Sequence, residues 1–227
     1  MGVIKQLQNF TSEDIKITSE QDVFFVSSAI HPYSKSSYTP KERLVQTLNT
    51  ISSIHKYNEN VYIIIMEATM LTENELSVLS PLCDCLVLFP QEQMSQLGKN
   101  NGEKFMSYQL AMRLINCSFR NMYKISGRYF LTDVFKTCNF SDTKITLRRA
   151  IWKPERLCML TVLYCVPSCQ FENYINALKN ALFNRQFEDI EHGLFQSLQP
   201  NSYIEVPMIG ASGQVAPEAV DAKLFVC

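Results

Sequence analysis

The chain has 227 residues, of which 46% are hydrophobic and 19% charged, and its formal net charge is −1. The near-neutral charge argues against a nucleic-acid-binding protein that depends on a large basic face. No apolar run approaches the roughly 18 residues needed to span a bilayer, and residues 1–17 lack a signal-peptide core. We therefore expect a cytoplasmic protein of ordinary globular composition, with no transmembrane segment and no nucleic-acid partner.

Several common site signatures are absent from the sequence. The eight cysteines form no C-x-x-C pair, which argues against structural zinc. Without a secretion signal, free thiols in a reducing compartment are the expectation. The chain has only 7 glycines and lacks the dinucleotide-binding glycine fingerprint, so a standard NAD-binding fold is not expected. A Gly-x-Ser-x-Gly elbow is also missing, which disfavours a hydrolase with a serine nucleophile.

In the first half of the chain, predicted strands and helices alternate. Short apolar runs predict buried strands over residues 23–28, 61–66, 85–89 and 123–128. Capping boxes that start at Thr39 and Thr72 predict helices, the first of which runs to about residue 57. A polar loop over 91–101 and a helix over 103–116 follow. This alternation predicts a parallel sheet with helices on its faces, which is a Rossmann-like half.

The second half is less regular. Strands are predicted over residues 144–152, 157–166 and 203–206. Helices are predicted after Ser168 and over 187–198. Residues 1–20 are interpreted as a polar leader or an edge element. Residues 208–227 are interpreted as a loose C-terminal tail rather than a lid.

Polar residues follow the predicted central strands at their carboxyl ends, where open α/β sheets bind ligands. The first strand ends on Ser27 and Ser28, and the second on Glu67. The fourth strand carries Lys124 and ends in the segment Ser126-Gly127-Arg128. A glycine allows close approach of a ligand, and the planar fork of an arginine suits a phosphate. Alternatively, these residues only close the turns after the strands.

The densest polar cluster lies near residue 190. On a helix over 187–198, Glu188, Glu191 and His192 share one face, whereas Asp189 points elsewhere. Two carboxylates and a histidine could supply a general base or a metal ligand. A solvated helix face is the alternative. Trp152, the only tryptophan, could stack on a sugar or belong to the core.

Four segments taken together resemble a known enzyme family. They are residues 23–28, the Arg-x-x-Gln-Thr segment that starts at Arg43, residues 63–67 and the Lys-Ile-Ser-Gly-Arg-Tyr segment that starts at Lys124. Over roughly residues 20–210, the chain is similar to small GT-A-like glycosyltransferases. These occur in large DNA viruses of algae, of the chlorovirus type, and in bacterial polysaccharide clusters.

The resemblance implies an α/β fold with one GT-A-like domain over residues 21–207. Its nucleotide-binding half would be 21–130 and its acceptor half 131–207. It also implies a hexosyl- or pentosyltransferase that moves a sugar from a UDP- or GDP-linked donor to a hydroxyl of a glycan acceptor. If the protein is viral, its compartment would be the host cytoplasm. A non-catalytic nucleotide- or glycan-binding module on the same fold is the alternative.

The resemblance also implies roles for individual residues. Donor contacts would be Ser27, Ser28, Glu67, Lys124, Ser126, Gly127 and Arg128. Trp152 and His192 would contact the acceptor. Glu191 would be the carboxylate base of an inverting reaction, with Asp189 and then Glu188 as the next candidates, and Arg128 would stabilise the leaving diphosphate.

The chain departs from the usual GT-A pattern because it contains no Asp-x-Asp motif. The segment Ser126-Gly127-Arg128 stands where that metal-binding motif is expected. Two interpretations follow. Either Arg128 and Lys124 offset the diphosphate charge without a metal, or other groups hold Mn or Mg, with Asp133 as the first candidate ligand.

Overall fold

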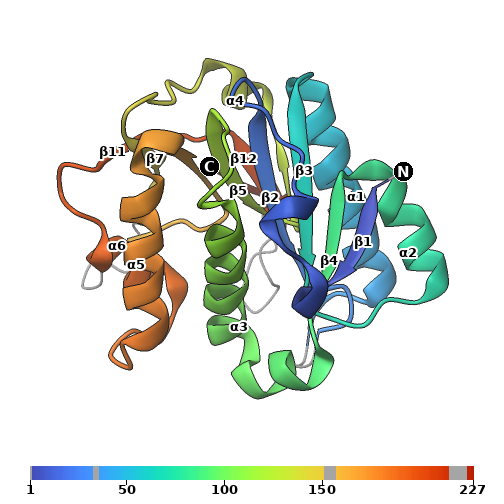
Figure 1. The fold of residues 1–227 in the computed structure, drawn as a ribbon. Coiled ribbons are helices and arrows are strands. Elements are labelled where there is room, and N and C mark those ends of the chain that lie inside the picture. The colour runs from blue at the N-terminus through green and yellow to red at the C-terminus, as the bar shows by residue number, and fades with distance from the viewer. Residues whose placement is uncertain (1, 33–35, 151–156, 215–223) are drawn as a thin grey trace.

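The computed structural model describes residues 2–32, 36–150, 157–214 and 224–227 (Figure 1). Its centre is an eight-stranded sheet in the order β1-β4-β3-β2-β5-β10-β7-β11. The strands are β1 (Val3–Gln6), β2 (Asp22–Ser28), β3 (Val61–Glu67), β4 (Cys85–Leu88), β5 (Asn121–Ser126), β7 (Ile145–Leu147), β10 (Leu163–Pro167) and β11 (Tyr203–Glu205). Among these described strands, β10 alone runs antiparallel to its neighbours. The expected α/β class, with a mostly parallel sheet and a Rossmann-like first half, is confirmed.

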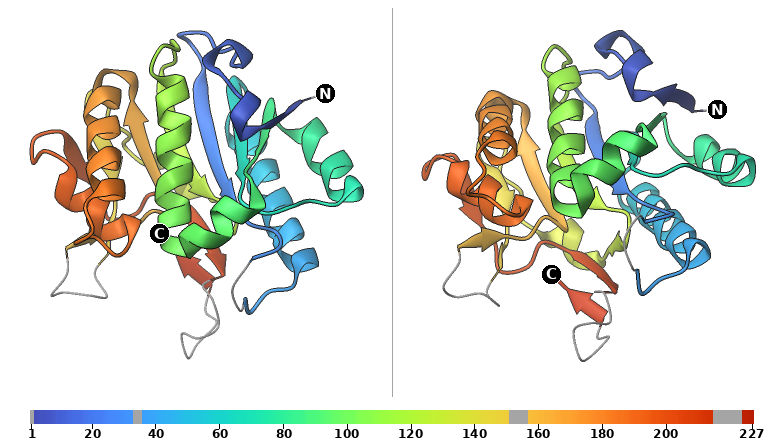
Figure 2. Two further views of the ribbon diagram at one scale, coloured as in Figure 1. Left: turned by 60° about the horizontal axis from the view of Figure 1, so that its bottom comes forward. Right: turned by 90° about the horizontal axis from the view of Figure 1, so that it is seen from below.

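Helices cover both faces of this sheet. They are α1 (Pro40–Tyr57), α2 (Glu73–Leu79), α3 (Gln91–Leu114), α4 (Asp133–Thr137), α5 (Phe171–Phe183) and α6 (Ile190–Ser197). Apolar residues of α3, α5 and α6 pack on one face, and those of α1, α2 and α4 pack on the other. Figures 1 and 2 show α3 and α5 side by side on the first of these faces.

The central strand β2 shows why the sheet is buried on both sides. Val23 and Phe25 belong to the core under α3, whereas Phe24 and Val26 belong to the core under α1. All four side chains are at most 1% exposed. A parallel strand covered on both faces needs such a continuous apolar run, because neither face meets water. Polar side chains therefore stand only at the two ends of β2, at Asp22 and at Ser27 and Ser28.

The predicted start of the first helix is confirmed in detail. The Thr39 hydroxyl accepts a hydrogen bond from the Glu42 amide at 3.3 Å, and the Glu42 carboxylate accepts one from the Thr39 amide at 2.7 Å. Two amides that would otherwise lack partners are thereby satisfied. This reciprocal cap fixes the amino end of α1 beside the carboxyl ends of the strands.

The expected polar loop over 91–101 is wrong, because these residues form the first turns of α3. The helix is broken at Gly98, whose φ of 67° and ψ of −177° are accessible mainly to glycine. Buried Met94 anchors the turns before the break. Two apolar residues, Met94 and Leu97, followed by a glycine break leave little periodic signal in a polar sequence, which explains the wrong prediction.

Two further elements differ from expectation in their bounds. The run over 157–166 contains two strands, β9 (Cys158–Met159) and β10, and β9 pairs with β8 (Arg149–Ala150) in a separate two-stranded sheet. The helix expected over 187–198 begins only at Ile190, because the Asp189 side chain caps it. Glu188 therefore precedes the helix.

The two ends of the chain are paired into sheets. The edge element expected near the start is β1, which pairs in parallel with β4. The expectation of a loose tail is wrong for the described residues, because β12 (Ala211–Gln214) lies between β6 (Tyr129–Leu131) and β13 (Leu224–Val226). Ile209 and Ala211 are fully buried and hold this segment against the core. The boundaries at residues 20, 130 and 207 stay predictions.

None of the described helices has the length and apolar character that crossing a bilayer requires.

Candidate functional site

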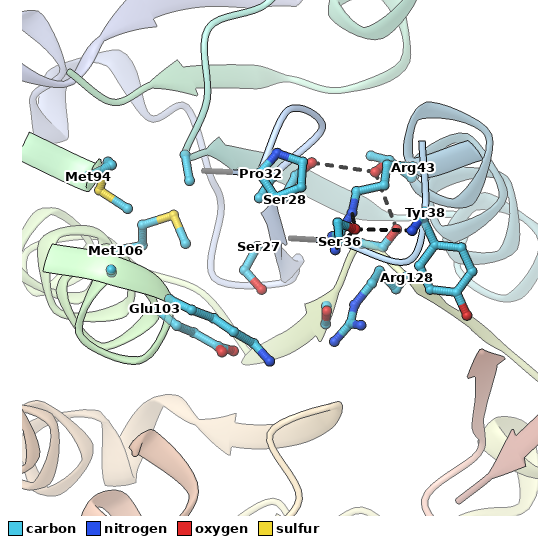
Figure 3. Close-up of a pocket in the computed structure, with 18 of the residues that line it drawn as sticks. Ser27, Ser28, Pro32, Ser36, Tyr38, Arg43, Met94, Glu103, Met106 and Arg128 are labelled. Carbon is cyan, nitrogen blue, oxygen red and sulfur yellow. Dashed lines mark hydrogen bonds between the residues drawn. The ribbon is translucent and has the colours of Figure 1, made fainter. Parts of the chain in front are cut away.

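A cavity of about 360 Å³ opens at the carboxyl ends of β2, β3 and β5 (Figure 3). Its walls come from the strand ends, from the loop after β2, and from the facing sides of α1 and α3. The lining residues used below are Ser27, Ser28, Arg43, Thr47, Glu103, Ser126, Gly127 and Arg128. Figure 3 shows Arg43 and Arg128 on one side of the cavity and Glu103 on the other. The site thus lies at the sheet edge predicted from the sequence.

Strand register brings the predicted polar residues of the floor together. Ser27 is paired with Ser126 across β2 and β5, and Ser28 with Glu67 across β2 and β3. The Gly127 amide donates to the Ser27 carbonyl at 2.8 Å. All of these residues except Glu67 line the cavity. The register therefore places these residues side by side at one edge of the sheet, and their role as donor contacts stays a prediction.

Gly127 permits a close approach between the end of β5 and helix α1. A Cβ atom at this position would lie 3.0 Å from the Thr47 hydroxyl oxygen and 3.3 Å from the Ser27 carbonyl oxygen. The Thr47 hydroxyl also donates to the Gly127 carbonyl at 3.3 Å. An added Cβ would force the Thr47 hydroxyl or the Ser27 carbonyl to shift by a few tenths of an ångström. The glycine therefore fixes the backbone from which Arg128 extends.

Glu67 lies beneath the cavity floor and is fully buried. One carboxyl oxygen, Oε1, accepts from the amides of Ile30 at 3.1 Å and of Thr69 at 2.9 Å. Burial raises the pKa of Glu67, and hydrogen bonds with Ser28, Thr69 and the Ile30 amide oppose that rise. The carboxyl fixes the loops after β2 and β3. It does not itself line the cavity.

Arg43 is a cavity-lining cation that the sequence analysis did not assign to the site. Its Nε and Nη2 atoms donate to the Ser36 hydroxyl at 3.2 and 3.0 Å. Burial and the positive charge of Arg128 lower the pKa of Arg43, so the two guanidinium groups act on each other. The available signal was the spacing of Arg43 and Thr47, which lie one turn apart in a helix that starts at the sheet edge.

Lys124 is not directed toward a ligand in the way the sequence suggested. Its side chain is fully buried, and Nζ donates to Glu103 Oε1 and to the Thr161 carbonyl, each at 2.5 Å. Glu103 belongs to α3, which covers the sheet, and Thr161 precedes β10, which continues the sheet beyond β5. Lys124 therefore connects the cavity wall to the second half of the chain, and Glu103 is the wall residue that it holds.

Glu191 belongs to the same charged cluster. Its Oε1 accepts from the Thr161 hydroxyl at 3.1 Å. Burial and the negative charge of Glu103 raise the pKa of Glu191, whereas the positive charge of Lys124 lowers it. The structure thus brings Glu191 close to the wall of the cavity, although the residue is not part of the lining. Glu103 is the carboxylate that the sequence analysis missed, because its partners are remote in the chain.

The other polar residues near 190 do not form the expected helix face. Asp189 is the N-cap of α6, and its Oδ1 accepts from the His192 amide at 2.8 Å. Glu188 precedes the helix and is exposed. The His192 ring packs edge-on against Phe187, with ring centroids 5.3 Å apart. Glu191 is linked to the cavity wall through Thr161, whose carbonyl accepts a hydrogen bond from Lys124, the partner of Glu103. Trp152 lies outside the described residues.

The residues present do not fit a divalent cation at the predicted position. Asp133 accepts a hydrogen bond from the Tyr57 hydroxyl at 2.8 Å. Tyr57 is the last residue of α1, whereas Arg43 lies in the first turn of that helix. Since a helix rises about 1.5 Å per residue, this separates Asp133 from the cavity. Across the described ranges, no cluster of three or more histidine, cysteine, aspartate or glutamate side chains could hold a metal.

No protein-family profile matches the chain, and no curated protein matches its sequence. Weak structural similarity extends to a transferase with cysteine-to-serine substitutions, at a TM-score of 0.49 and 10% identity over 86% of this chain and 94% of that one. It also extends to the apo form of the glycosyltransferase GlyE of Streptococcus pneumoniae TIGR4, at a TM-score of 0.48 and 8% identity over 82% of this chain and 45% of that one. For the apo form of mouse xyloside xylosyltransferase 1, the TM-score is 0.47 and the sequence identity 9%, over 82% of this chain and 85% of that one. At such values, a functional argument has to rest on the site itself.

Proposed function

We propose that the protein is a glycosyltransferase that moves a sugar from a nucleotide-sugar donor to a hydroxyl of a glycan. The observation that carries this proposal is the cavity at the carboxyl ends of parallel strands, with Arg43 and Arg128 in its wall. Neither arginine forms an ion pair within the described residues. Guanidinium groups in a cavity wall suit an anionic ligand, and a nucleoside diphosphate offers two phosphates and a planar base.

The donor would lie across the floor of the cavity. Ser27 and Ser28 can bond the nucleoside, and Ser126 and Gly127 allow the diphosphate to approach the end of β5 closely. Glu67 then acts from below, because it fixes the loop after β2 that forms one wall. A UDP- or GDP-linked sugar remains the donor class that we propose.

The transfer would proceed with a carboxylate as base. The acceptor hydroxyl oxygen attacks the anomeric carbon and forms the new glycosidic bond. The bond between that carbon and the diphosphate oxygen breaks, and the nucleoside diphosphate leaves with the bonding electrons. Glu191 takes the proton of the acceptor hydroxyl. Its raised pKa favours this role, because a base is most effective when its pKa approaches the working pH.

The acceptor would approach from the side of α6, where Glu191 and His192 lie. We propose His192 and Trp152 as acceptor contacts. Asp189 is a cap of this helix, so substitutions there act on the position of Glu191 as well as on charge.

A non-catalytic binding module is the second candidate, and one observation favours it: the Glu191 carboxyl does not line the cavity. The two candidates differ in turnover. Purified protein is incubated with UDP- and GDP-linked sugars, and release of the nucleoside diphosphate is measured with and without glycan acceptors. If the protein is a transferase, the wild type should release the nucleoside diphosphate and Glu191→Gln should not. Tight nucleotide binding without release in any mixture would identify a binding module.

A further inference from the structure

The charges around the cavity are unbalanced. Among its described lining residues, the cations are Arg43, Lys99 and Arg128, and the one carboxylate is that of Glu103. That carboxylate is already paired with Lys124 at 2.5 Å. No acidic group of the lining is therefore left to compensate the two arginines. An anion that enters the cavity would meet uncompensated positive charge.

Both arginines are held in place before any ligand binds. The Ser36 hydroxyl accepts from two nitrogens of the Arg43 guanidinium. The Arg128 guanidinium lies over the Tyr129 ring, 5.8 Å from its centroid. The backbone of Arg128 is fixed by the close contact of Gly127 with Thr47. Side chains held in this way lose little conformational freedom when they bind, which favours affinity.

The two arginines come from different elements and meet at one cavity. Arg43 extends from the first turns of α1, and Arg128 follows the end of β5. Burial, and after it the charge of Arg128, lowers the pKa of Arg43, and the fully buried Glu67 opposes that effect from beneath the floor. Two cations that line the same cavity repel each other, and a bound anion offsets this repulsion.

The carboxylate that lines the cavity and the one beneath its floor are poorly suited to hold a divalent cation between phosphate and protein. Mg²⁺ and Mn²⁺ need ionised oxygen ligands that are free to coordinate. Glu103 is occupied by the Lys124 ammonium, and Glu67 by the amides of Ile30 and Thr69. The segment Ser126-Gly127-Arg128 offers no carboxylate at all. The positive charge at this position therefore comes from side chains.

We propose that Arg43 and Arg128 form a clamp that binds the diphosphate of the nucleotide donor from two sides and replaces a divalent cation. This inference rests on the proposed function and adds Arg43 to the site. In the transfer reaction, the clamp neutralises the negative charge that develops on the leaving diphosphate. Lys124, which the sequence suggested for this task, is instead a positioning residue for Glu103.

The test is a calorimetric titration of UDP and GDP into the full-length protein, once with EDTA and once with Mg²⁺ or Mn²⁺. The clamp predicts dissociation constants that agree within about twofold between the two buffers for at least one nucleotide. It further predicts that Arg43→Gln and Arg128→Gln each weaken binding about ten- to a hundredfold, because a charge-assisted hydrogen bond is lost. Binding of the corresponding nucleoside, which carries no phosphate, should change much less in both variants.

The matched control is Lys144→Gln, which removes one positive charge from an exposed residue before β7. β7 runs in the direction of β5, so Lys144 lies at the opposite edge of the sheet. This variant should bind as wild type does, and a melting temperature is recorded for every variant to exclude unfolding.

The outcomes separate the clamp from the function on which it rests. Binding that requires the metal, or binding in EDTA that both arginine variants retain, overturns the clamp but leaves a nucleotide site. Absence of binding for every nucleotide in both buffers overturns the clamp together with the proposed function. Arg43→Lys and Arg128→Lys add a further test, because they keep the charge but lose the planar fork and should still weaken binding.

Discussion

Two cationic residues four positions apart in the chain, Lys124 and Arg128, have opposite environments. Lys124 is fully buried, and its ammonium group contacts Glu103 and the Thr161 carbonyl. Arg128 lines the cavity and, within the described residues, forms no ion pair. A buried cation whose partners are all internal contributes to the structure, whereas a cavity-lining cation that is paired with no carboxylate is available to a ligand. The comparison shows that environment, rather than residue type, separates structural from binding cations.

The same contrast applies to the acidic residues. Glu67 is fixed by backbone amides of two loops, so its role is to shape the cavity. Glu191 has one hydroxyl partner, Thr161, and lies beside the charged groups of Glu103 and Lys124. Burial is the main cause that raises the pKa of both carboxyls, and Glu191 in addition lies beside the ion pair of Glu103 and Lys124.

The largest effect is expected for the proposed base. Glu191→Gln should lower the transfer rate about 10²- to 10⁴-fold, which is the usual contribution of a general base. The dissociation constant of the nucleotide should stay within about threefold of wild type, because the carboxyl lies outside the cavity lining. Single-turnover kinetics and calorimetry measure the two effects. The control Glu172→Gln changes an exposed residue of α5 and should leave both unchanged.

Glu67 is expected to affect stability more than chemistry. Glu67→Ala leaves the buried amides of Ile30 and Thr69 without their acceptor, and should lower the free energy of unfolding by about 2–5 kcal/mol. Glu67→Gln keeps a carbonyl acceptor at nearly the same size, so its loss should be about 1 kcal/mol or less. Urea denaturation measures both values. Equal destabilisation by the two substitutions would refute the assignment of the carboxyl oxygen as loop acceptor.

The stability of wild type relative to Glu67→Gln should depend on pH. Burial raises the pKa of Glu67 in the folded state, so the folded protein binds this proton more tightly than the unfolded chain does. The stabilising contribution of the protonated carboxyl is therefore complete below the unfolded pKa of about 4.3 and is lost as the pH rises through the folded value. Urea titrations at several pH values should show wild type losing stability relative to the variant in that direction. The reverse trend would contradict a raised pKa.

The charged neighbours of Glu191 should shift the pH profile of transfer in opposite directions. The Lys124 charge lowers the pKa of Glu191, so Lys124→Met should move the acidic limb of the rate profile to higher pH. The Glu103 charge raises that pKa, so Glu103→Gln should move the limb to lower pH. A purely structural role for these residues predicts lower rates without opposite shifts.

The smallest effect is expected at the amino end of α1. Thr39→Ala removes the reciprocal cap with Glu42 and should lower the free energy of unfolding by about 1 kcal/mol. Thr39→Ser keeps the hydroxyl and should restore most of that loss. A nucleotide affinity that falls tenfold in Thr39→Ala but not in Thr39→Ser would show that the cap also positions Arg43.

The parts of the fold that the sequence predicted are those with local causes. The strands over 23–28 and 61–66 are apolar runs that need burial on both faces, and the helix after Thr39 begins with a capping box. The first turns of α3 were missed, because a polar segment interrupted by Gly98 has no clear period. The C-terminal strands were missed because β12 depends on pairing with β6, some 80 residues earlier in the chain.

The candidate site was predictable where residues end a strand and unpredictable where two distant elements meet. Ser27, Ser28 and Gly127 follow from their positions after apolar runs. The partnership of Lys124 with Glu103 depends on the packing of α3 over β5, which no local pattern specifies. The same limit concealed Arg43, since its relation to Arg128 arises only when α1 packs beside the end of β5.

The most direct test of the central claim is a crystal structure of the protein with bound UDP or GDP, grown in the presence of EDTA. The proposal predicts the diphosphate in the cavity at the carboxyl ends of β2 and β5. Its oxygens should lie about 2.7–2.9 Å from nitrogens of both Arg43 and Arg128, the distance of charge-assisted hydrogen bonds. A nucleotide bound elsewhere, or a diphosphate that touches neither arginine, would contradict it.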